Sequence, residues 1–213
     1  DLIMNFTAKK ILGPIVYEST ESHKFLSQEI NFLRSKMKAY DSSWGPMATK
    51  DNRILEYEET ENLKKFIMDH LNNYVHTVLQ ITDDVEFYIT ESWVNCLEPQ
   101  RQHPIHTHGN SIISGVLFIL PEESKGASPL VFGTDYHETF RGFEFPYKQM
   151  DYPYVLHEQG KVVIFPSSAA HAVPENRDGQ ERWSLSFNTF FRGKLGVSGI
   201  NCTDAVGNRL TLS

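Results

Sequence analysis

Residues 182–188 have the sequence RWSLSFN, in which apolar and polar side chains alternate at every position. A period of two residues is typical of a β-strand, whose successive side chains point to opposite faces. One face of this expected strand carries Trp183, Leu185 and Phe187. The other carries an arginine, two serines and an asparagine, a set that suits the wall of a polar cavity. The alternative is an edge strand with a surface arginine.

Arg182, the first residue of this stretch, presents a planar fork of N–H donors that suits a carboxylate. Ser184 lies two residues further along the same face and is placed to donate to the same oxygen atoms. We therefore expect Arg182 and Ser184 to bind an acidic ligand.

Other parts of the chain also have regular hydrophobic periods. Strand-like runs cover residues 85–94, 111–120, 129–132 and 161–165, and the arginine stretch extends to residue 192. Before them, apolar residues recur at steps of three and four over 22–40 and 60–80, which predicts two amphipathic helices. Helices followed by short strands predict a mainly β fold, an antiparallel barrel or sandwich with the helices packed outside.

The length of 213 residues suits a single domain over 1–213. Within it we expect a helical support region over 1–82 and a β core over 83–192. The tail over 193–213 is rich in Gly and Thr and is expected to be irregular.

Composition and charge restrict the partners of this protein. There are 20 Lys and Arg residues against 27 Asp and Glu, a net charge of −7, so binding to nucleic acid is not expected. No apolar run is long enough to span a bilayer, so no membrane is expected. Cys96 and Cys202 lack metal-site spacing and are expected to be free thiols in the cytoplasm.

Three histidines have the spacing and setting of metal ligands. His106 and His108 are two residues apart, so an extended chain points both to one side. His171 directly follows an apolar strand and small residues, which leaves room for a third ligand. Imidazole suits iron, zinc, copper or nickel. A solvated loop for the pair, and a histidine bonded to a backbone carbonyl for His171, are the alternatives.

Taken together, these motifs resemble those of a known family. In chain order they are SWVN at 92–95, HTH at 106–108, SGV at 114–116, FPS at 165–167 with His171, and RWSLSFN at 182–188. They resemble the iron(II)- and 2-oxoglutarate-dependent oxygenases, and within them the 2-oxoglutarate oxygenases of bacteria and marine bacteriophages. The resemblance implies a double-stranded β-helix, a jelly-roll or cupin-like barrel, with Fe(II) as metal, 2-oxoglutarate as cosubstrate and dioxygen as oxidant.

The resemblance also assigns residues. Carried over by position, His106, His108 and His171 bind the iron and Arg182 binds the far carboxylate of 2-oxoglutarate. Asn95 and Ser114 lie on neighbouring motif strands and are candidates for further cosubstrate contacts.

One of these positions departs from the pattern of most of the family. Most members carry Asp or Glu at the position of His108, so three neutral imidazoles would leave a more positive metal centre. Asp135 is a candidate for a carboxylate from elsewhere, although a turn residue is its other role.

Two other functions stay open at this point. Cupins share the barrel and use three histidines and a glutamate, but isoleucines stand where that glutamate belongs, and cupins do not require Arg182. A non-catalytic binding module is the third hypothesis. The substrate is a small molecule or a peptide of unknown identity, and a homodimer is expected by analogy alone.

The remaining aromatic and histidine residues receive plainer predictions. His103 is expected in a loop, His157 on the surface, and Trp93 in the core. The aromatic-rich segment 136–154 is expected to be a lid over the pocket or a loop packed on the barrel.

Overall fold

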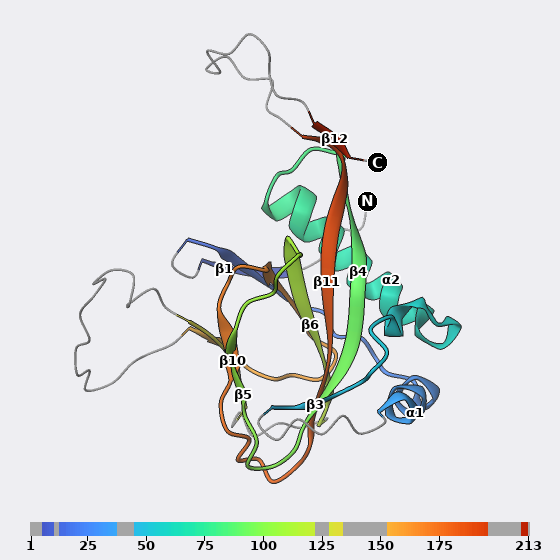
Figure 1. Ribbon diagram of the computed structural model, residues 1–213, viewed down its shortest axis with the longest axis vertical. Helices are drawn as coiled ribbons and strands as arrows, with labels where there is room; N and C mark the ends of the chain where they lie inside the picture. Colours follow the sequence, from blue (N-terminus) through green and yellow to red (C-terminus); the bar gives the residue numbers. More distant parts are fainter. Residues whose placement is uncertain are drawn as a thin grey trace, which may run out of the picture.

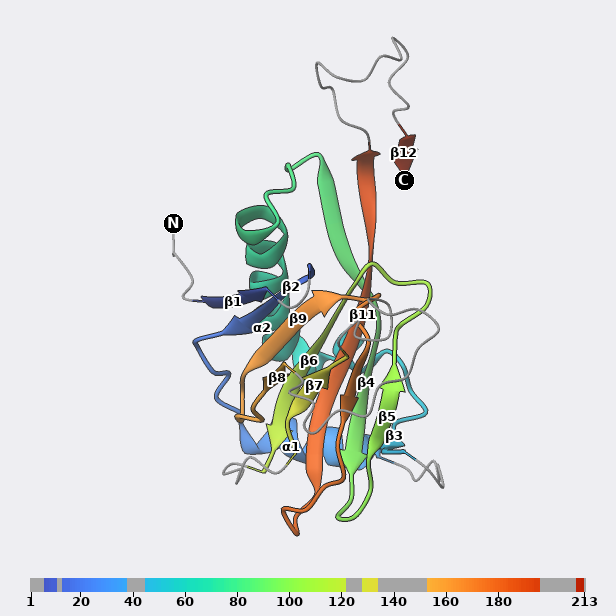
Figure 2. The same cartoon turned by 90° about the vertical axis from the view of Figure 1, so that its left-hand side faces the viewer.

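Two antiparallel sheets make up most of the computed structural model, which describes residues 6–10, 13–37, 45–121, 128–133, 153–195 and 210–212 (Figures 1 and 2). The major sheet, in spatial order, contains β1 (Phe6–Lys10), β2 (Ile15–Ser19), β9 (Val162–Pro166), β6 (Ile113–Leu120), β11 (Arg182–Leu195), β4 (Val85–Leu97) and β3 (Met47–Ala48), with β12 (Leu210–Leu212) beside β11. The minor sheet has the order β5 (His103–His106), β10 (His171–Val173), β7 (Leu130–Phe132) and β8 (Tyr154–Val155). This is a double-stranded β-helix, as expected from the sequence.

The core has two parts, and the alternation of the strands separates them. Val116 and Phe118 of β6 pack with residues of the minor sheet, so this part of the core lies between the sheets. Leu117 and Ile119, one position along, point to the other face and pack against the helices. β11 behaves in the same way, since Trp183, Leu185 and Phe187 all join the helix side. The predicted two-faced strand over 182–188 is therefore confirmed.

The helices cover the outer face of the major sheet. They are α1 (Ser27–Lys36) and α2 (Glu61–Asn72), with short 3-10 turns η1 (Ile54–Glu56) and η2 (Glu58–Thr60) before α2 and a π-helical turn η3 (Asn73–Val78) after it. Leu63, Ile67 and Leu71 of α2 are fully buried at steps of four, which confirms the predicted amphipathic face.

The first predicted helix is too long. Residues 22–26 are not helical, because the backbone N–H of His23 donates to the Gly160 carbonyl and Leu26 has an extended conformation. Residues 38–40 lie outside the described part of the chain.

The prediction of a helical region over 1–82 is wrong in part, since β1, β2 and β3 lie within it. β2 joins the major sheet through Tyr17, which pairs with Ile164 of β9, and Tyr17 is fully buried. A strand of five residues gives too short an alternating pattern to be recognised. The tail is likewise not wholly irregular, because β11 continues to Leu195 and pairs with β12.

Two further predictions can be compared with the described residues. Cys96 is a buried free thiol, whereas Cys202 lies outside the described residues. Within the described part of the chain, no helix is both long and apolar enough to cross a membrane.

Candidate active site

Three imidazoles converge at one mouth of the barrel. His106 ends β5 and lies directly opposite His171 of β10, and His108 follows two residues after β5. One ring nitrogen of each residue lies within 4.8 Å of the corresponding nitrogens of the other two. The structure thus brings together the three histidines that the sequence suggested, in a group that fits around a single metal ion.

Hydrogen bonds fix the orientation of all three rings. The Nδ1 atoms lie 2.8 Å from the Pro104 carbonyl for His106, 2.6 Å from the Asn188 side-chain oxygen for His108, and 2.9 Å from the Ala169 carbonyl for His171. Because carbonyl oxygens only accept, each Nδ1 carries the proton and leaves Nε2 with its lone pair free. This is the tautomer that a metal-binding histidine requires.

Burial affects the protonation of two of these rings, His171 and His108. Burial lowers the pKa of His171 to about 3. Burial likewise lowers the pKa of His108, although the Asn188 bond opposes this effect. His171, with its pKa at about 3, is therefore neutral at pH 7 and does not have to lose a proton before it binds a cation.

His103 belongs to this cluster, which corrects the prediction of a loop residue. A β-bulge in β5 shifts the register, so that His171 faces His106 but Val173 faces His103. With one extra residue in the strand, His103 and His106 point to the same side although they are three apart. Their rings stack with centroids 4.2 Å apart. Neither the bulge nor this stacking is visible in the HxH pattern.

The polar face of β11 forms the inner wall behind the histidines. Arg182, Ser184 and Ser186 line a narrow inner cavity of about 20 Å³ together with Asn95. A wider hollow of about 530 Å³ shares the histidines and Trp93 and opens outward past Pro104. Trp93 thus lines the site rather than the core. The inner cavity has room for about one water molecule, so side chains must move apart to admit a larger ligand.

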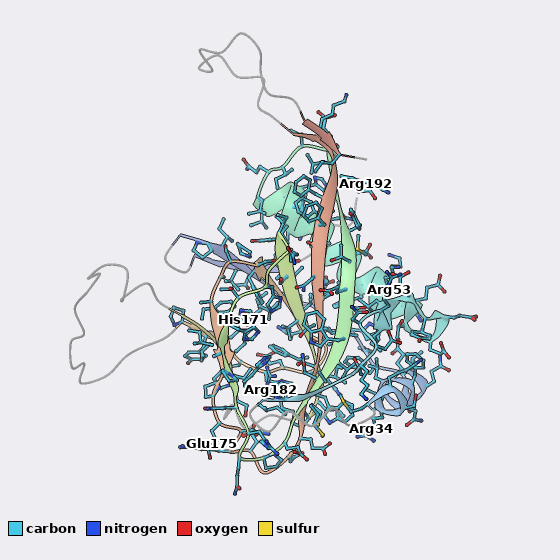
Figure 3. The ribbon with its side chains drawn as sticks, viewed as in Figure 1. Arg34, Arg53, His171, Glu175, Arg182 and Arg192 are labelled. Carbon is cyan, nitrogen blue, oxygen red and sulfur yellow. The ribbon has the colours of Figure 1, made fainter. Side chains whose placement is uncertain are left out.

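Arg182 is buried without a full set of partners. Its side chain is 5% exposed, its Nε donates to the Ser128 carbonyl at 3.1 Å, and Nη2 has no hydrogen-bond partner among the described residues. Burial lowers the pKa of Arg182 to about 10, with Asp178 opposing, so the guanidinium stays charged at pH 7. Figure 3 shows Arg182 at the end of β11 that lies near His171, with Arg192 at the opposite end. An incompletely paired buried cation is suited to an anionic ligand.

The segment that contains this site matches a known protein family. Residues 91–188 match the family described as "Putative 2OG-Fe(II) oxygenase", and this segment contains every predicted site residue. This segment is similar to the 2OG-Fe(II) oxygenase family. No protein of curated function matches the chain in sequence.

Several solved structures are similar to this chain in fold. A 2OG-Fe(II) oxygenase family oxidoreductase from Burkholderia pseudomallei aligns with a TM-score of 0.54 and 13% identity over 82% of this chain and 83% of its own. HygX from Streptomyces hygroscopicus, crystallised with nickel, 2-oxoglutarate and hygromycin B, gives 0.53 and 10% over 81% and 82%. The viral collagen prolyl hydroxylase of Paramecium Bursaria Chlorella virus-1 gives 0.50 and 16% over 79% and 94%. At these identities the likeness shows the fold alone.

The residues of this site fit the two groups that the matching family uses, a ferrous ion and 2-oxoglutarate. Three Nε2 donors with fixed tautomers suit a ferrous ion. The unpartnered Nη2 of Arg182, in the same cavity, suits the carboxylate of a keto diacid.

The other two predicted cosubstrate contacts have partners within the protein. Asn95 lines the cavity, and its side-chain nitrogen donates to Ser186 Oγ at 2.9 Å. The Ser114 hydroxyl is fully buried, 2.7 Å from Ser167 Oγ and 2.8 Å from the Asn188 side-chain oxygen. Their contact with a cosubstrate stays a prediction. Asp135 and residues 136–152 lie outside the described part of the chain.

His157 is a buried residue that the sequence reasoning placed on the surface. It is 3% exposed, and neither ring nitrogen has a hydrogen-bond partner among the described residues. Burial, together with the positive charge of Arg182, lowers the pKa of His157 to about 3. Its ring packs on Phe118, with centroids 4.6 Å apart. No spacing in the sequence signals this role, because β8 and its neighbours are too short to show a period.

Proposed function

We propose that this protein is an Fe(II)- and 2-oxoglutarate-dependent oxygenase that hydroxylates a small organic substrate, with His106, His108 and His171 as iron ligands and Arg182 as the anchor of the cosubstrate. The single observation that carries this proposal is the joint placement of the three free Nε2 atoms and the unpartnered Nη2 in one cavity. A metal-binding cupin has no use for a buried, unpaired guanidinium behind its histidines.

Each residue has a defined task in this proposal. The three imidazoles would hold the metal beside the cavity. Arg182 binds the far carboxylate and thereby orients the cosubstrate, and Ser184 donates to the same carboxylate. When bound, iron and 2-oxoglutarate supply the activation of dioxygen, and the protein supplies orientation and a site from which water is excluded.

The outer hollow supports a small-molecule or peptide substrate. Its volume of about 530 Å³ lies within the usual range for such ligands, and Trp93 and Pro104 give it apolar surface beside the histidines. The net charge of −7 argues against a nucleic acid. A homodimer, a cytoplasmic location, and a bacterial or phage origin stay predictions.

Anaerobic binding followed by turnover tests this proposal. The purified protein is titrated with iron(II) and then with 2-oxoglutarate under argon, and succinate release is measured after addition of oxygen. We expect 2-oxoglutarate to bind only with Arg182 intact, and succinate to form. Binding of metal without any response to 2-oxoglutarate would indicate a cupin, and binding of neither would indicate a non-catalytic barrel.

A further inference from the structure

Among the three candidate ligands, His108 alone is connected to a carboxylate by its ring hydrogen bond. His106 and His171 donate to backbone carbonyls, which are neutral. His108 instead donates to the side-chain oxygen of Asn188 at 2.6 Å. The side-chain nitrogen of Asn188 in turn donates to Oε2 of Glu91 at 3.1 Å. Two hydrogen bonds therefore lead from the imidazole to a glutamate.

The sheet fixes the direction of these bonds. Asn188 of β11 lies opposite Ser114 of β6 on one side and Glu91 of β4 on the other. The Ser114 hydroxyl donates to the same Asn188 oxygen at 2.8 Å, so that oxygen accepts two hydrogen bonds. Only the nitrogen is then left to face Glu91, which as a carboxylate can only accept. The amide therefore cannot flip without losing three hydrogen bonds.

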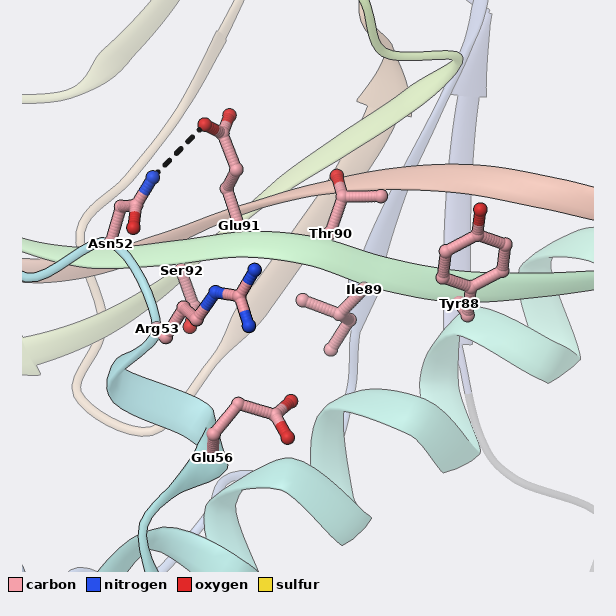
Figure 4. A pocket seen from close by; sticks show the side chains of 8 residues that line it. All are labelled: Asn52, Arg53, Glu56, Tyr88, Ile89, Thr90, Glu91 and Ser92. Carbon is pink, nitrogen blue, oxygen red and sulfur yellow. Dashed lines mark hydrogen bonds between the residues drawn. The ribbon is translucent and has the colours of Figure 1, made fainter.

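Glu91, at the far end of this series of hydrogen bonds, is also held in place. Glu91 is half-buried at the rim of a hollow of about 390 Å³ between β4 and the turn at residues 52–56. Figure 4 shows Glu91 extending toward Asn52, whose side-chain nitrogen donates to the second carboxylate oxygen at 3.2 Å. Both oxygens of Glu91 thus accept an amide N–H, which limits the rotation of the carboxylate.

We propose that Glu91 and Asn188 are positioning residues that supply, through two hydrogen bonds, the negative charge that the direct ligands of this metal site lack. The inference rests on the proposed function, because it concerns the same metal. His108 occupies the position at which most of the resembling family has a carboxylate ligand. Here the carboxylate lies further out, and Asn188 transmits its effect while it holds the ring with Nε2 toward the metal.

Electrostatics act in the required direction. The Glu91 carboxylate is joined to the His108 ring by two hydrogen bonds through Asn188, and its negative charge favours positive charge on that ring. A group that stabilises a proton on this ring also stabilises a cation bound to it. Hydrogen bonds from a ligating histidine to an outer carboxylate make the ring a stronger donor, and their loss typically costs about 10- to 100-fold in metal affinity.

The decisive experiment measures the metal alone, by anaerobic titration with cobalt(II), whose absorption and paramagnetic proton NMR report on each imidazole N–H. The variant Glu91→Gln keeps an oxygen to accept from Asn188 and removes the charge, and its amide nitrogen replaces the oxygen that accepts from Asn52. We expect it to weaken cobalt binding by about 10-fold and to shift one of three exchangeable imidazole N–H signals. Glu86→Gln, on the same strand but exposed and paired with Arg192, is the matched control and should change neither.

A double variant tests whether the charge itself matters. In Asn188→Asp combined with Glu91→Gln, the carboxylate moves one link closer to His108, and the glutamine side chain can still donate to it. We expect cobalt affinity to recover to at least the wild-type level. Equal cobalt affinity of wild type and Glu91→Gln, with unchanged N–H signals, would overturn the proposed role of Glu91 and Asn188 while leaving the metal site intact. Failure of the wild type to bind cobalt would instead overturn the proposed function.

Discussion

Replacement of Arg182 by methionine separates a ligand-binding role of this residue from a structural one. If the guanidinium binds the far carboxylate of 2-oxoglutarate, Arg182→Met removes a buried charge pair from the complex. Such truncations cost about 2–5 kcal/mol, so the dissociation constant for 2-oxoglutarate should rise by at least ~30-fold. Iron binding should not change, because Arg182 touches none of the three histidines by any described hydrogen bond.

The structure predicts a small effect on the protein without ligand. Burial lowers the pKa of Arg182 from 12.5 to about 10, a penalty of ~3 kcal/mol that the variant no longer has. Against this, the variant loses the bond from Nε to the Ser128 carbonyl, which for a charged donor is worth about 1.5–3 kcal/mol. The two effects nearly cancel, so we expect the free energy of unfolding to change by less than ~2 kcal/mol.

Thermal unfolding under argon with iron(II) measures both effects together. At a 2-oxoglutarate concentration 100 times its dissociation constant, the wild type should gain ~2.7 kcal/mol, which raises Tm by roughly 5–10 °C for a chain of this size. Arg182→Met at the same concentration should gain almost nothing.

Arg192→Met is the matched control, since Arg192 lies on the same strand, is exposed and pairs with Glu86. It should respond to 2-oxoglutarate like the wild type. A loss of 3–5 kcal/mol in ligand-free Arg182→Met, with the 2-oxoglutarate response intact, would refute the reasoning, because that is the signature of a broken structural ion pair.

Three further outcomes are expected. His171→Ala should abolish cobalt binding, as seen by loss of the cobalt absorption bands, while far-UV circular dichroism stays unchanged. The pKa of His157 lies at about 3 in the folded protein against 6.5 in the unfolded chain, so the unfolded state binds the extra proton as pH falls. In urea titrations, protonation of His157 in the unfolded chain should lower the free energy of unfolding of the wild type by ~3 kcal/mol between pH 7 and pH 4. Over the same pH range, the free energy of unfolding of His157→Phe should fall by ~3 kcal/mol less than that of the wild type. Gly115→Ala should destabilise the protein by several kcal/mol in the same titration, because its Cβ would lie 2.2 Å from Phe187 Cζ and 2.8 Å from the Val163 carbonyl.

The amphipathic strand β11 and the amphipathic helix α2 could be predicted from the sequence because each is long enough for its hydrophobic pattern to repeat several times. The alternation over 182–188 predicted both faces of β11, and the steps of four in α2 predicted the face packed on the sheet. The convergence of His106, His108 and His171 was also accessible, from the two-residue spacing and from the family resemblance.

The parts that the sequence did not reveal depend on contacts between distant residues. β2 is held by pairing with β9, and β10 by pairing with β5 and β7, and three to five residues are too few to show a period. His103 enters the site through a bulge, and His157 is buried by neighbours that lie far away in the sequence. Glu91 and Asn188 are ordinary strand residues until β4 and β11 are placed side by side.

The direct pairing of His106 with His171 across β5 and β10 has a consequence for how the barrel mouth assembles. These strands have only four and three residues, and a slip of one residue would turn one of the imidazoles to the far side. An ion bound by both rings would stabilise this register of β5 against β10 over the registers shifted by one residue. Amide hydrogens of this short sheet should accordingly exchange more slowly once metal is added, while those of the long central strands stay as they were.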